Sequence, residues 1–277
     1  MKHSVDPNSA KDARRWSNPV RARLQAGETV LALTLTTSNL ETAVLGATLG
    51  FDFLWVEMEH SPITLETLRS IVLATRGLRA SVFARVPVVE LWTAKRVLDQ
   101  GVTGVIFPFA STPQLAQRAA RACKYPPAGL RGSGAGLATS TWPLPGSYYD
   151  SADANVMVIT VIEEAVAVEH IDEIAATPGI DVLFIGTSDL SFSLGLRGRQ
   201  DEPLLAAAIE KVVAAARRHG KFLGRPAANA EQILRLREQG FQMFQCMTEL
   251  GLMAQGARSL LGPLGIEGVP ADQKVLY

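Results

Sequence analysis

Several charged side chains follow short apolar segments, where they could take part in catalysis. Glu57, Glu59 and His60 stand at or just after the segment 53–57, and Arg85 ends another apolar run. Glu163 and Asp189 follow two further apolar segments. Paired carboxylates suit a hard cation such as Mg²⁺ or Mn²⁺, which takes one or two protein carboxylates and completes its shell with other oxygens. An imidazole and a guanidinium beside such an ion could move a proton and stabilise a developing negative charge.

Each of these residue types also occurs in purely structural roles. His60 could be a hydrogen-bonded core histidine, and Arg85 a structural ion-pair partner. Asp189 could cap a helix, because it stands in the run Ser-Asp-Leu-Ser. Asp99 could be an ordinary acid on a helix surface. Arg225 could bind an anionic end of a substrate or cap its strand, and the sequence does not choose between the two.

The elements that must position these residues alternate along the chain. Apolar segments predict strands over 29–36, 53–57, 81–86, 104–108, 156–163, 182–186, 222–225 and 243–247. Helical periodicity predicts helices over 65–76, 91–100, 114–124, 165–176, 204–219 and 230–239, several of them followed by glycine. Eight apolar strands with intervening helices favour a (β/α)8 TIM barrel, in which catalytic groups gather at the carboxyl ends of the strands.

The length of 277 residues fits one such barrel, over 21–262. Residues 1–20 are polar and residues 263–277 are rich in Gly and Pro, so we expect an N-terminal arm and a C-terminal tail. The 27 basic residues balance 27 acidic ones, which argues against nucleic acid or an anionic membrane as partner. The absence of a secretory signal pattern and of a long apolar span predicts a soluble, cytoplasmic protein.

Some chemistry is excluded by what the sequence lacks. No lysine falls at a predicted carboxyl end of a strand, so Schiff-base catalysis is not expected. The two cysteines form no zinc motif, and no GxSxG elbow is present. The glycines of 132–136 follow no strand, which disfavours dinucleotide binding. We therefore expect no organic cofactor.

Four motifs together resemble the HpcH/HpaI aldolases, a family of metal-dependent pyruvate aldolases that includes 4-hydroxy-2-oxoheptanedioate aldolases. They are WVEMEHSP at 55–62, YPPAGLRG at 125–132, VIE at 161–163 and DVLFIGTSDLS at 181–191. They stand in the family's order, and the resemblance spans roughly residues 20–262. It implies a barrel of the phosphoenolpyruvate/pyruvate type whose last helix is exchanged between subunits of a homohexamer, a trimer of dimers.

The resemblance also implies roles for single residues. Glu163 and Asp189 would bind Mg²⁺ or Mn²⁺, with Co²⁺ a further possibility, and Arg85 would steady the enolate oxygen. His60 would be the acid–base group, with Asp99 raising its basicity and fixing its tautomer. The remaining contacts would come from the backbone near Gly186 and Ser188, which would hold the substrate carboxylate, and from Glu57 and Glu59 behind these groups.

The expected reaction is cleavage or formation of a 4-hydroxy-2-oxo acid through a metal-stabilised enolate. The products would be pyruvate or hydroxypyruvate and an aldehyde. Two departures concern the pocket: Glu57 stands where the family usually has Asp, and Val161 replaces a glutamine that contacts substrate. Two alternatives stay open: a lyase for CoA thioesters of the citryl or malyl type, and a non-catalytic barrel that binds keto acids.

Overall fold

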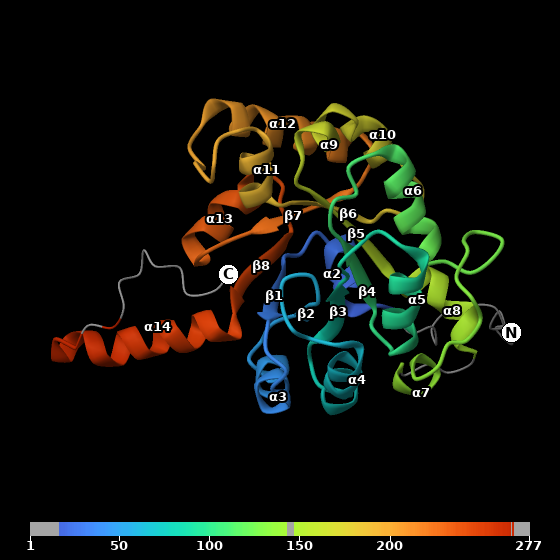
Figure 1. The fold of residues 1–277 in the computed structure, drawn as a ribbon, viewed down its shortest axis with the longest axis horizontal. Coiled ribbons are helices and arrows are strands. Elements are labelled where there is room, and N and C mark those ends of the chain that lie inside the picture. The colour runs from blue at the N-terminus through green and yellow to red at the C-terminus, as the bar shows by residue number, and fades with distance from the viewer. Residues whose placement is uncertain (1–16, 143–146, 267, 269–277) are drawn as a thin grey trace, which may run out of the picture.

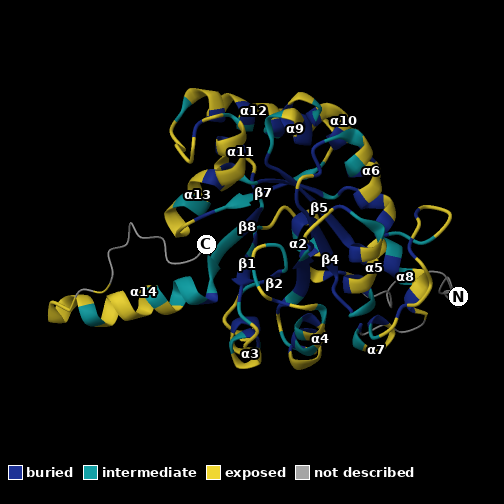
Figure 2. Ribbon diagram, viewed as in Figure 1, coloured by how far each residue is buried: buried dark blue, intermediate teal, exposed yellow. Residues whose placement is uncertain are grey.

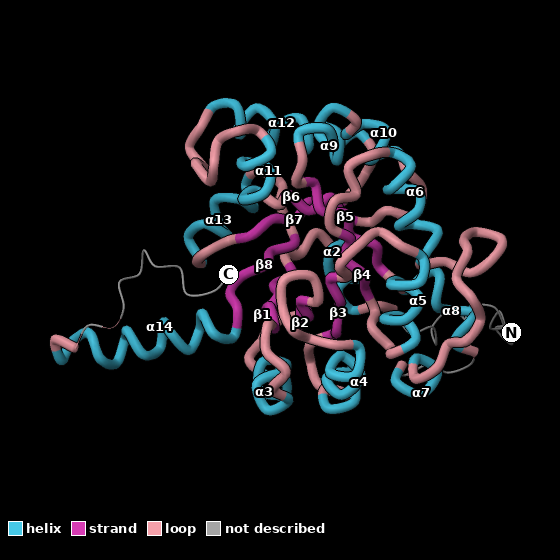
Figure 3. Tube along the Cα trace, viewed as in Figure 1, coloured by secondary structure: helices cyan, strands magenta, loops and turns pink. Residues whose placement is uncertain are grey.

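The computed structural model describes residues 17–142, 147–266 and 268. Within them, parallel strands close into a barrel in sequence order, each hydrogen-bonded to the next and β8 to β1. Figures 1 and 3 show these strands at the centre, with helices around them. This confirms the predicted (β/α)8 barrel. The strands are β1 Val30–Leu35, β2 Phe53–Glu57, β3 Ser81–Arg85, β4 Gly104–Phe107, β5 Met157–Ile162, β6 Val182–Ile185, β7 Phe222–Pro226 and β8 Met243–Thr248.

The helices connect the strands and lie outside them. They are α2 Pro19–Gln25, α3 Leu40–Thr48, α4 Leu65–Ala74, α5 Leu91–Asp99, α6 Pro113–Ala122, α7 Ala138–Thr141, α8 Tyr148–Asn155, α9 Ala165–Glu169, α10 Ile171–Ala176, α11 Thr187–Ser193, α12 Pro203–Arg218, α13 Ala230–Glu238 and α14 Glu249–Leu261, followed by the 3₁₀ turn η1 Gly262–Leu264. The single helix predicted over 165–176 is two helices, because the chain turns at His170, which ends α9 and precedes α10.

Alternation along each strand divides the core into two parts. One set of side chains fills the barrel interior, including Phe53, Trp55, Phe83 and Phe184. The intervening side chains, such as Leu54 and Val56, pack outward against the helices. The strands are therefore buried on both faces, which explains their near-continuous apolar sequences. Figure 2 shows most of the central strands in the colour of buried residues.

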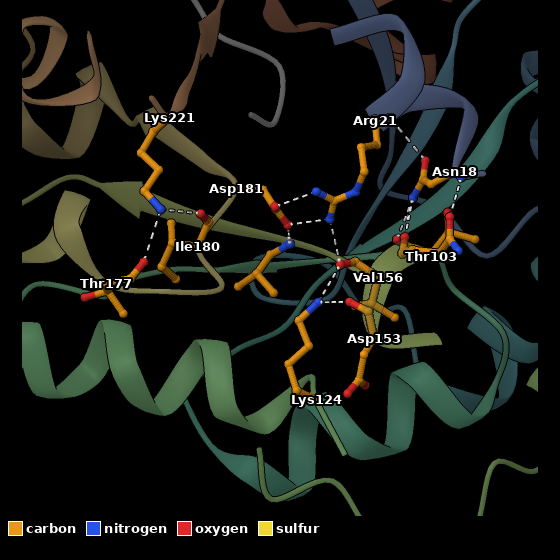
Figure 4. Close-up of polar contacts among 12 residues, drawn as sticks. Asn18, Arg21, Thr103, Lys124, Asp153, Val156, Thr177, Ile180, Asp181 and Lys221 are labelled. Carbon is orange, nitrogen blue, oxygen red and sulfur yellow. Dashed lines mark hydrogen bonds and ion pairs between the residues drawn. The ribbon is translucent and has the colours of Figure 1, made fainter. Parts of the chain in front are cut away.

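A network of polar contacts closes the amino-terminal end of the barrel (Figure 4). The side-chain amide of Asn18 donates to the carbonyls of Thr103 at 3.0 Å and Asn155 at 2.9 Å, and its oxygen caps α2. Arg21 forms a two-point ion pair with Asp181, at 2.7 and 2.9 Å. The predicted arm 1–20 thus ends in a helix that is tied to the barrel, while residues 1–16 lie outside the described residues.

The carboxyl end of the chain leaves the barrel. In Figure 1, α14 projects away from the other helices, and Figure 2 shows most of its length as exposed or intermediate. Met253 and Leu260 on it are 68% and 71% exposed. Of the predicted tail 263–277, residues 267 and 269–277 lie outside the described residues. No described helix is long and apolar enough to cross a membrane.

Candidate active site

A cavity of about 1420 Å³ opens at the carboxyl ends of the strands. The sequence-predicted residues that line it are Glu57, His60, Arg85, Glu163, Gly186, Ser188 and Asp189. These residues come from separate parts of the chain. They meet because parallel strands in a closed barrel all end at the same rim.

Arg85 connects the acidic residues of this site. It ends β3, its side chain is 12% exposed, and its Nη1 lies 3.3 Å from Oε2 of Glu57. Its Nη2 contacts Oε2 of Glu59 and lies 3.8 Å from Oε2 of Glu163. A single guanidinium thus faces three carboxylates, two of which are supplied by the end of β2 and the turn after it. Buried charges of this kind persist only when they are paired.

Glu163 is almost fully buried, with its side chain 1% exposed. Its Oε1 accepts a hydrogen bond of 2.7 Å from the backbone N–H of Phe109. Burial raises the pKa of Glu163 to about 7; the Phe109 hydrogen bond and Arg85 oppose this rise, and the negative charges of Glu59 and Asp189 add to it. Phe109 has a φ of +50°, a left-handed conformation that is costly for a non-glycine residue. This strained residue thus helps to fix Glu163, and no sequence signal marks it.

Asp189 lies in the first turn of α11, and Gly186 precedes that helix. A Cβ on Gly186 would lie 3.0 Å from Cβ and from Oε2 of Glu163, and 3.0 Å from Cγ1 of Val161. A side chain at this position would therefore push Glu163 or Val161 aside by a few tenths of an ångström. Asp189 receives no hydrogen bond or ion pair from the described residues, so its carboxylate is available to a ligand in the cavity.

The donor set fits a divalent cation. Glu57, Glu59, Glu163 and Asp189 bring more negative charge than Arg85 balances. The described residues contain no cluster of three or more His, Cys, Asp or Glu side chains able to hold a metal ion. Two carboxylates with open space beside them match Mg²⁺, which keeps water or substrate oxygens in its shell.

The departures at Glu57 and Val161 are accommodated by their immediate neighbours. The longer Glu57 side chain accepts a hydrogen bond of 3.2 Å from Nε1 of Trp55 as well as contacting Arg85. Val161 is 2% exposed and belongs to the apolar barrel interior with Trp55 and Phe184, whose rings lie 5.0 Å apart. Sequence reasoning missed Trp55 as a residue of the cavity, because a tryptophan in an apolar strand also fits an ordinary core.

Asp99 is not brought to His60. It ends α5, which returns the chain to the amino-terminal end of the barrel before β4. There its Oδ1 accepts a hydrogen bond of 3.0 Å from Nη2 of Arg131, a buried arginine that also bonds to Tyr148. Burial raises the pKa of Asp99, and Arg131 opposes that rise. A sequence signal for this location was present. In a (β/α)8 barrel the helix after a strand runs back, so its last residue lies at the end of the barrel opposite to the active-site rim.

Arg225 lines the side of the cavity next to α13. Its guanidinium carbon lies 5.5 Å from the centre of the Phe241 ring, which packs in the outer core. The pKa of Arg225 is lowered, first by burial and then by the positive charge of Arg235. The alternation of β7 agrees with this placement, because Gly224 faces Phe184 in the interior and Arg225 follows it. Arg225 therefore belongs to the outer wall and not to the carboxylate cluster.

Known proteins are similar to this chain in fold and in sequence. Residues 32–255 match the profile of the family described as HpcH/HpaI aldolase/citrate lyase. A 5-keto-4-deoxy-D-glucarate aldolase from Salmonella arizonae is 33% identical over 80% of this chain and 87% of its own. A hydroxypyruvate/pyruvate aldolase from Paraburkholderia phytofirmans is 32% identical over 89% of this chain and 97% of its own.

The solved structures agree. The crystal structure of an HpcH/HpaI aldolase/citrate lyase family protein from Burkholderia cenocepacia superimposes with a TM-score of 0.84. The two chains are 31% identical, and the match covers 90% of this chain and 100% of the other. This chain therefore belongs to the HpcH/HpaI aldolase/citrate lyase family and is an enzyme of the aldolase and lyase class.

Proposed function

We propose that this enzyme cleaves or forms 4-hydroxy-2-oxo acids, with pyruvate or hydroxypyruvate and an aldehyde as the other side of the reaction. The observation that carries the proposal is one cavity that contains Glu163, Asp189, Arg85 and His60 at the carboxyl rim of the barrel. The names of the two relatives, a 5-keto-4-deoxy-D-glucarate aldolase and a hydroxypyruvate/pyruvate aldolase, support the same substrate class.

In this proposal Glu163 and Asp189 hold Mg²⁺ or Mn²⁺, with Co²⁺ as a further candidate and no organic cofactor. When bound, the cation supplies positive charge that polarises the 2-oxo group of the substrate. The excess of carboxylates over guanidinium in the cavity supports this assignment, because a cation relieves the repulsion among them.

The protein's own residues would carry out the remaining steps. His60 takes the proton from the C4 hydroxyl as the C3–C4 bond breaks, and the new carbonyl leaves as the aldehyde. The electron pair of that bond becomes an enolate, whose oxygen is stabilised by the charge of Arg85. Backbone N–H groups near Gly186 and Ser188 orient the substrate carboxylate. A proton returned to C3 completes the keto acid.

The first test is exchange of the pyruvate methyl protons in D₂O, followed by ¹H NMR. Pyruvate alone is sufficient for this test, because enolisation needs no aldehyde. We expect exchange in the presence of Mg²⁺ or Mn²⁺, and we expect EDTA to abolish it. Exchange with hydroxypyruvate alone would place that acid as the nucleophile. If neither acid exchanges with any of the three metals, the proposed reaction is wrong, and a CoA-thioester lyase or a keto-acid-binding barrel takes its place.

Asp189→Ala tests the metal site separately. We expect this variant to lose Mn²⁺ binding, measured by electron paramagnetic resonance of free Mn²⁺, together with turnover. Glu210→Ala, which removes an acid on α12, is the matched control for general loss of negative charge. Turnover by Asp189→Ala that remains sensitive to EDTA would remove Asp189 from the ligand set.

We also propose that the enzyme is a homohexamer, a trimer of dimers, in which subunits exchange α14. The projecting helix and the turn η1 after it support this, because Met253, Leu260 and Leu264 are each at least 68% exposed. Globular proteins rarely leave such apolar side chains together in water. Sedimentation equilibrium should give the mass of six 29.7 kDa chains, and deletion from residue 249 should reduce it. An unchanged hexamer after this deletion would exclude exchange of α14.

A further inference from the structure

The part of the cavity wall that β1 and β8 supply is uncharged. The residues of these two strands and of the segment just after β1 that line the cavity are Thr34, Thr36, Gln245, Cys246, Met247 and Thr248. The carboxylate cluster, Arg85 and His60 come instead from β2, β3 and β5 and from the segments that follow β2, β5 and β6. The cavity therefore has an uncharged side that faces away from the groups of the proposed reaction.

Thr34 and Gln245 point into the barrel from this side. Ala32 on β1 and Met243 on β8 belong to the barrel interior, so alternation turns Thr34 and Gln245 inward as well. The pairing of the two strands shifts between them, because Ala32 pairs with Gln245 whereas Thr34 pairs with Thr248. The strand β8 thus has one extra residue at this point. Such bulges redirect side chains and are common next to active sites.

The polar atoms of these two side chains are not used by the protein. Thr34 is 3% exposed, and its hydroxyl makes no hydrogen bond with any described residue. Within the same described ranges, the side-chain amide of Gln245 makes none either. The hydroxyl of the neighbouring Thr36, in contrast, donates to Oε1 of Glu249 at 3.2 Å. A buried hydroxyl without a partner is unfavourable, so this wall indicates a ligand that supplies the missing hydrogen bonds.

Thr34 lies across the barrel mouth from the carboxylates that hold the acid end of the substrate in our proposal. In a barrel of eight strands closed in sequence order, β1 is opposite β5, which is followed directly by Glu163. The rings of Trp55 on β2 and Phe184 on β6 lie 5.0 Å apart, and both residues line the cavity. They form an apolar floor between the two sides. A substrate held at Glu163 and Asp189 therefore extends over this floor, and its aldehyde half reaches β1 and β8.

We propose that Thr34 and Gln245 form a subsite for an uncharged hydroxyl group on the aldehyde half of the substrate, so that the enzyme acts on hydroxyaldehydes. This inference rests on the proposed aldol function and narrows its substrate class. A hydroxyl group both donates and accepts, and it therefore matches a threonine hydroxyl and a glutamine amide. A carboxylate would meet no positive charge on β1 or β8, and an alkyl group would leave both polar side chains unpaired.

The test compares two aldehydes of nearly equal size, glycolaldehyde and propanal, which differ by a hydroxyl in place of a methyl group. Each is added to pyruvate, or to hydroxypyruvate if only that acid undergoes exchange, and kcat/KM for the aldehyde is measured. The hydroxyl also changes the intrinsic reactivity of the carbonyl, so the informative quantity is the ratio of the two kcat/KM values in each variant. We expect Thr34→Val and Gln245→Met each to lower the ratio of glycolaldehyde to propanal by about fivefold to tenfold.

Two further variants separate a lost hydrogen bond from a disturbed wall. Thr34→Ser keeps the hydroxyl, so its ratio should stay close to that of the wild type. Thr36→Val is the matched control, because Thr36 lines the same cavity but its hydroxyl is already bonded to Glu249. Its ratio should not change. Circular dichroism establishes that each variant is folded, and Gln245→Met provides an independent reading should Thr34→Val fail to fold.

Three results would overturn the subsite while the aldol function stands. They are a ratio that stays at the wild-type value in Thr34→Val and Gln245→Met, an equal fall of the ratio in Thr36→Val, and exchange in the wild type without turnover of glycolaldehyde. An effect of Thr34→Val on proton exchange of hydroxypyruvate alone would place the bound hydroxyl on the keto acid and also contradict the proposal. Failure of the aldol function is distinguishable, because it appears as a lack of exchange with either keto acid in the wild type, before any aldehyde is added.

Discussion

Asn18 tests how much the polar network at the amino-terminal end of the barrel contributes to stability. We expect Asn18→Ala to lower the free energy of unfolding by about 2.5 to 5.5 kcal/mol, because three interactions are lost together. Loss of the α2 cap costs about 1 kcal/mol. Loss of the hydrogen bond to the Thr103 carbonyl costs about 0.5–1.5 kcal/mol. The cost is moderate because this carbonyl still accepts a hydrogen bond from the backbone N–H of Met157. Loss of the donor to the Asn155 carbonyl costs about 1–3 kcal/mol.

The measurement is urea unfolding followed by tryptophan fluorescence and circular dichroism, with the m value compared between variants. Asn39→Ala is the matched control, because Asn39 also caps a helix but is exposed and bonds to the neighbouring Thr42 of α3. It should cost about 1 kcal/mol. Equal destabilisation of the two variants would refute the reasoning, since it would mean that the buried contacts of Asn18 contribute nothing beyond capping.

Three further predictions concern the site and the surface. Arg85→Ala should lower kcat by at least about 100-fold. It should bind Mn²⁺ as well as or better than wild type, because a positive charge beside the metal ligands is removed. Loss of Mn²⁺ binding in this variant would show that Arg85 organises the metal site. Gly186→Ala should remain folded by circular dichroism but bind Mn²⁺ about tenfold more weakly, because its methyl group displaces Glu163, and unchanged affinity would contradict this. His219 and Arg218 lower the pKa of Asp172 in the folded protein. Their ion pairs with Asp172 therefore stabilise the fold at pH values above the pKa that Asp172 has in the unfolded chain, about 4. This stabilisation is lost as the pH falls through the lower pKa of Asp172 in the folded protein. The Tm difference between wild type and Asp172→Asn should therefore narrow below about pH 4, and a constant difference down to about pH 2 would argue against the pairing.

Much of the fold could be predicted from local patterns. The apolar segments of the sequence predicted the ends of all eight strands to within two residues, because buried parallel strands are almost wholly apolar. The break at His170 was missed, because both halves of 165–176 keep an apolar face with helical spacing. The helix α3 was also missed. Its sequence, LETAVLGAT, is mostly small and apolar, so it gives only a weak amphipathic signal.

The sequence by itself determined that the charged residues at the carboxyl ends of the strands reach the active-site rim. Glu57, Arg85 and Glu163 stand at or just after the ends of parallel strands, and the closed barrel brings all such ends together. That inference needs only the order of elements and the position of each residue within its element. It therefore succeeds before any contact between side chains is known.

Only the tertiary structure decided which of these groups contact one another. The pairing of Glu59 with His60, of Asp99 with Arg131, and the N–H of Phe109 that holds Glu163 depend on backbone directions in turns. Such contacts join residues whose separation in the sequence carries no period, so no pattern predicts them. The departure of α14 from the barrel has the same origin, since its sequence does not record whether the helix packs on its own barrel.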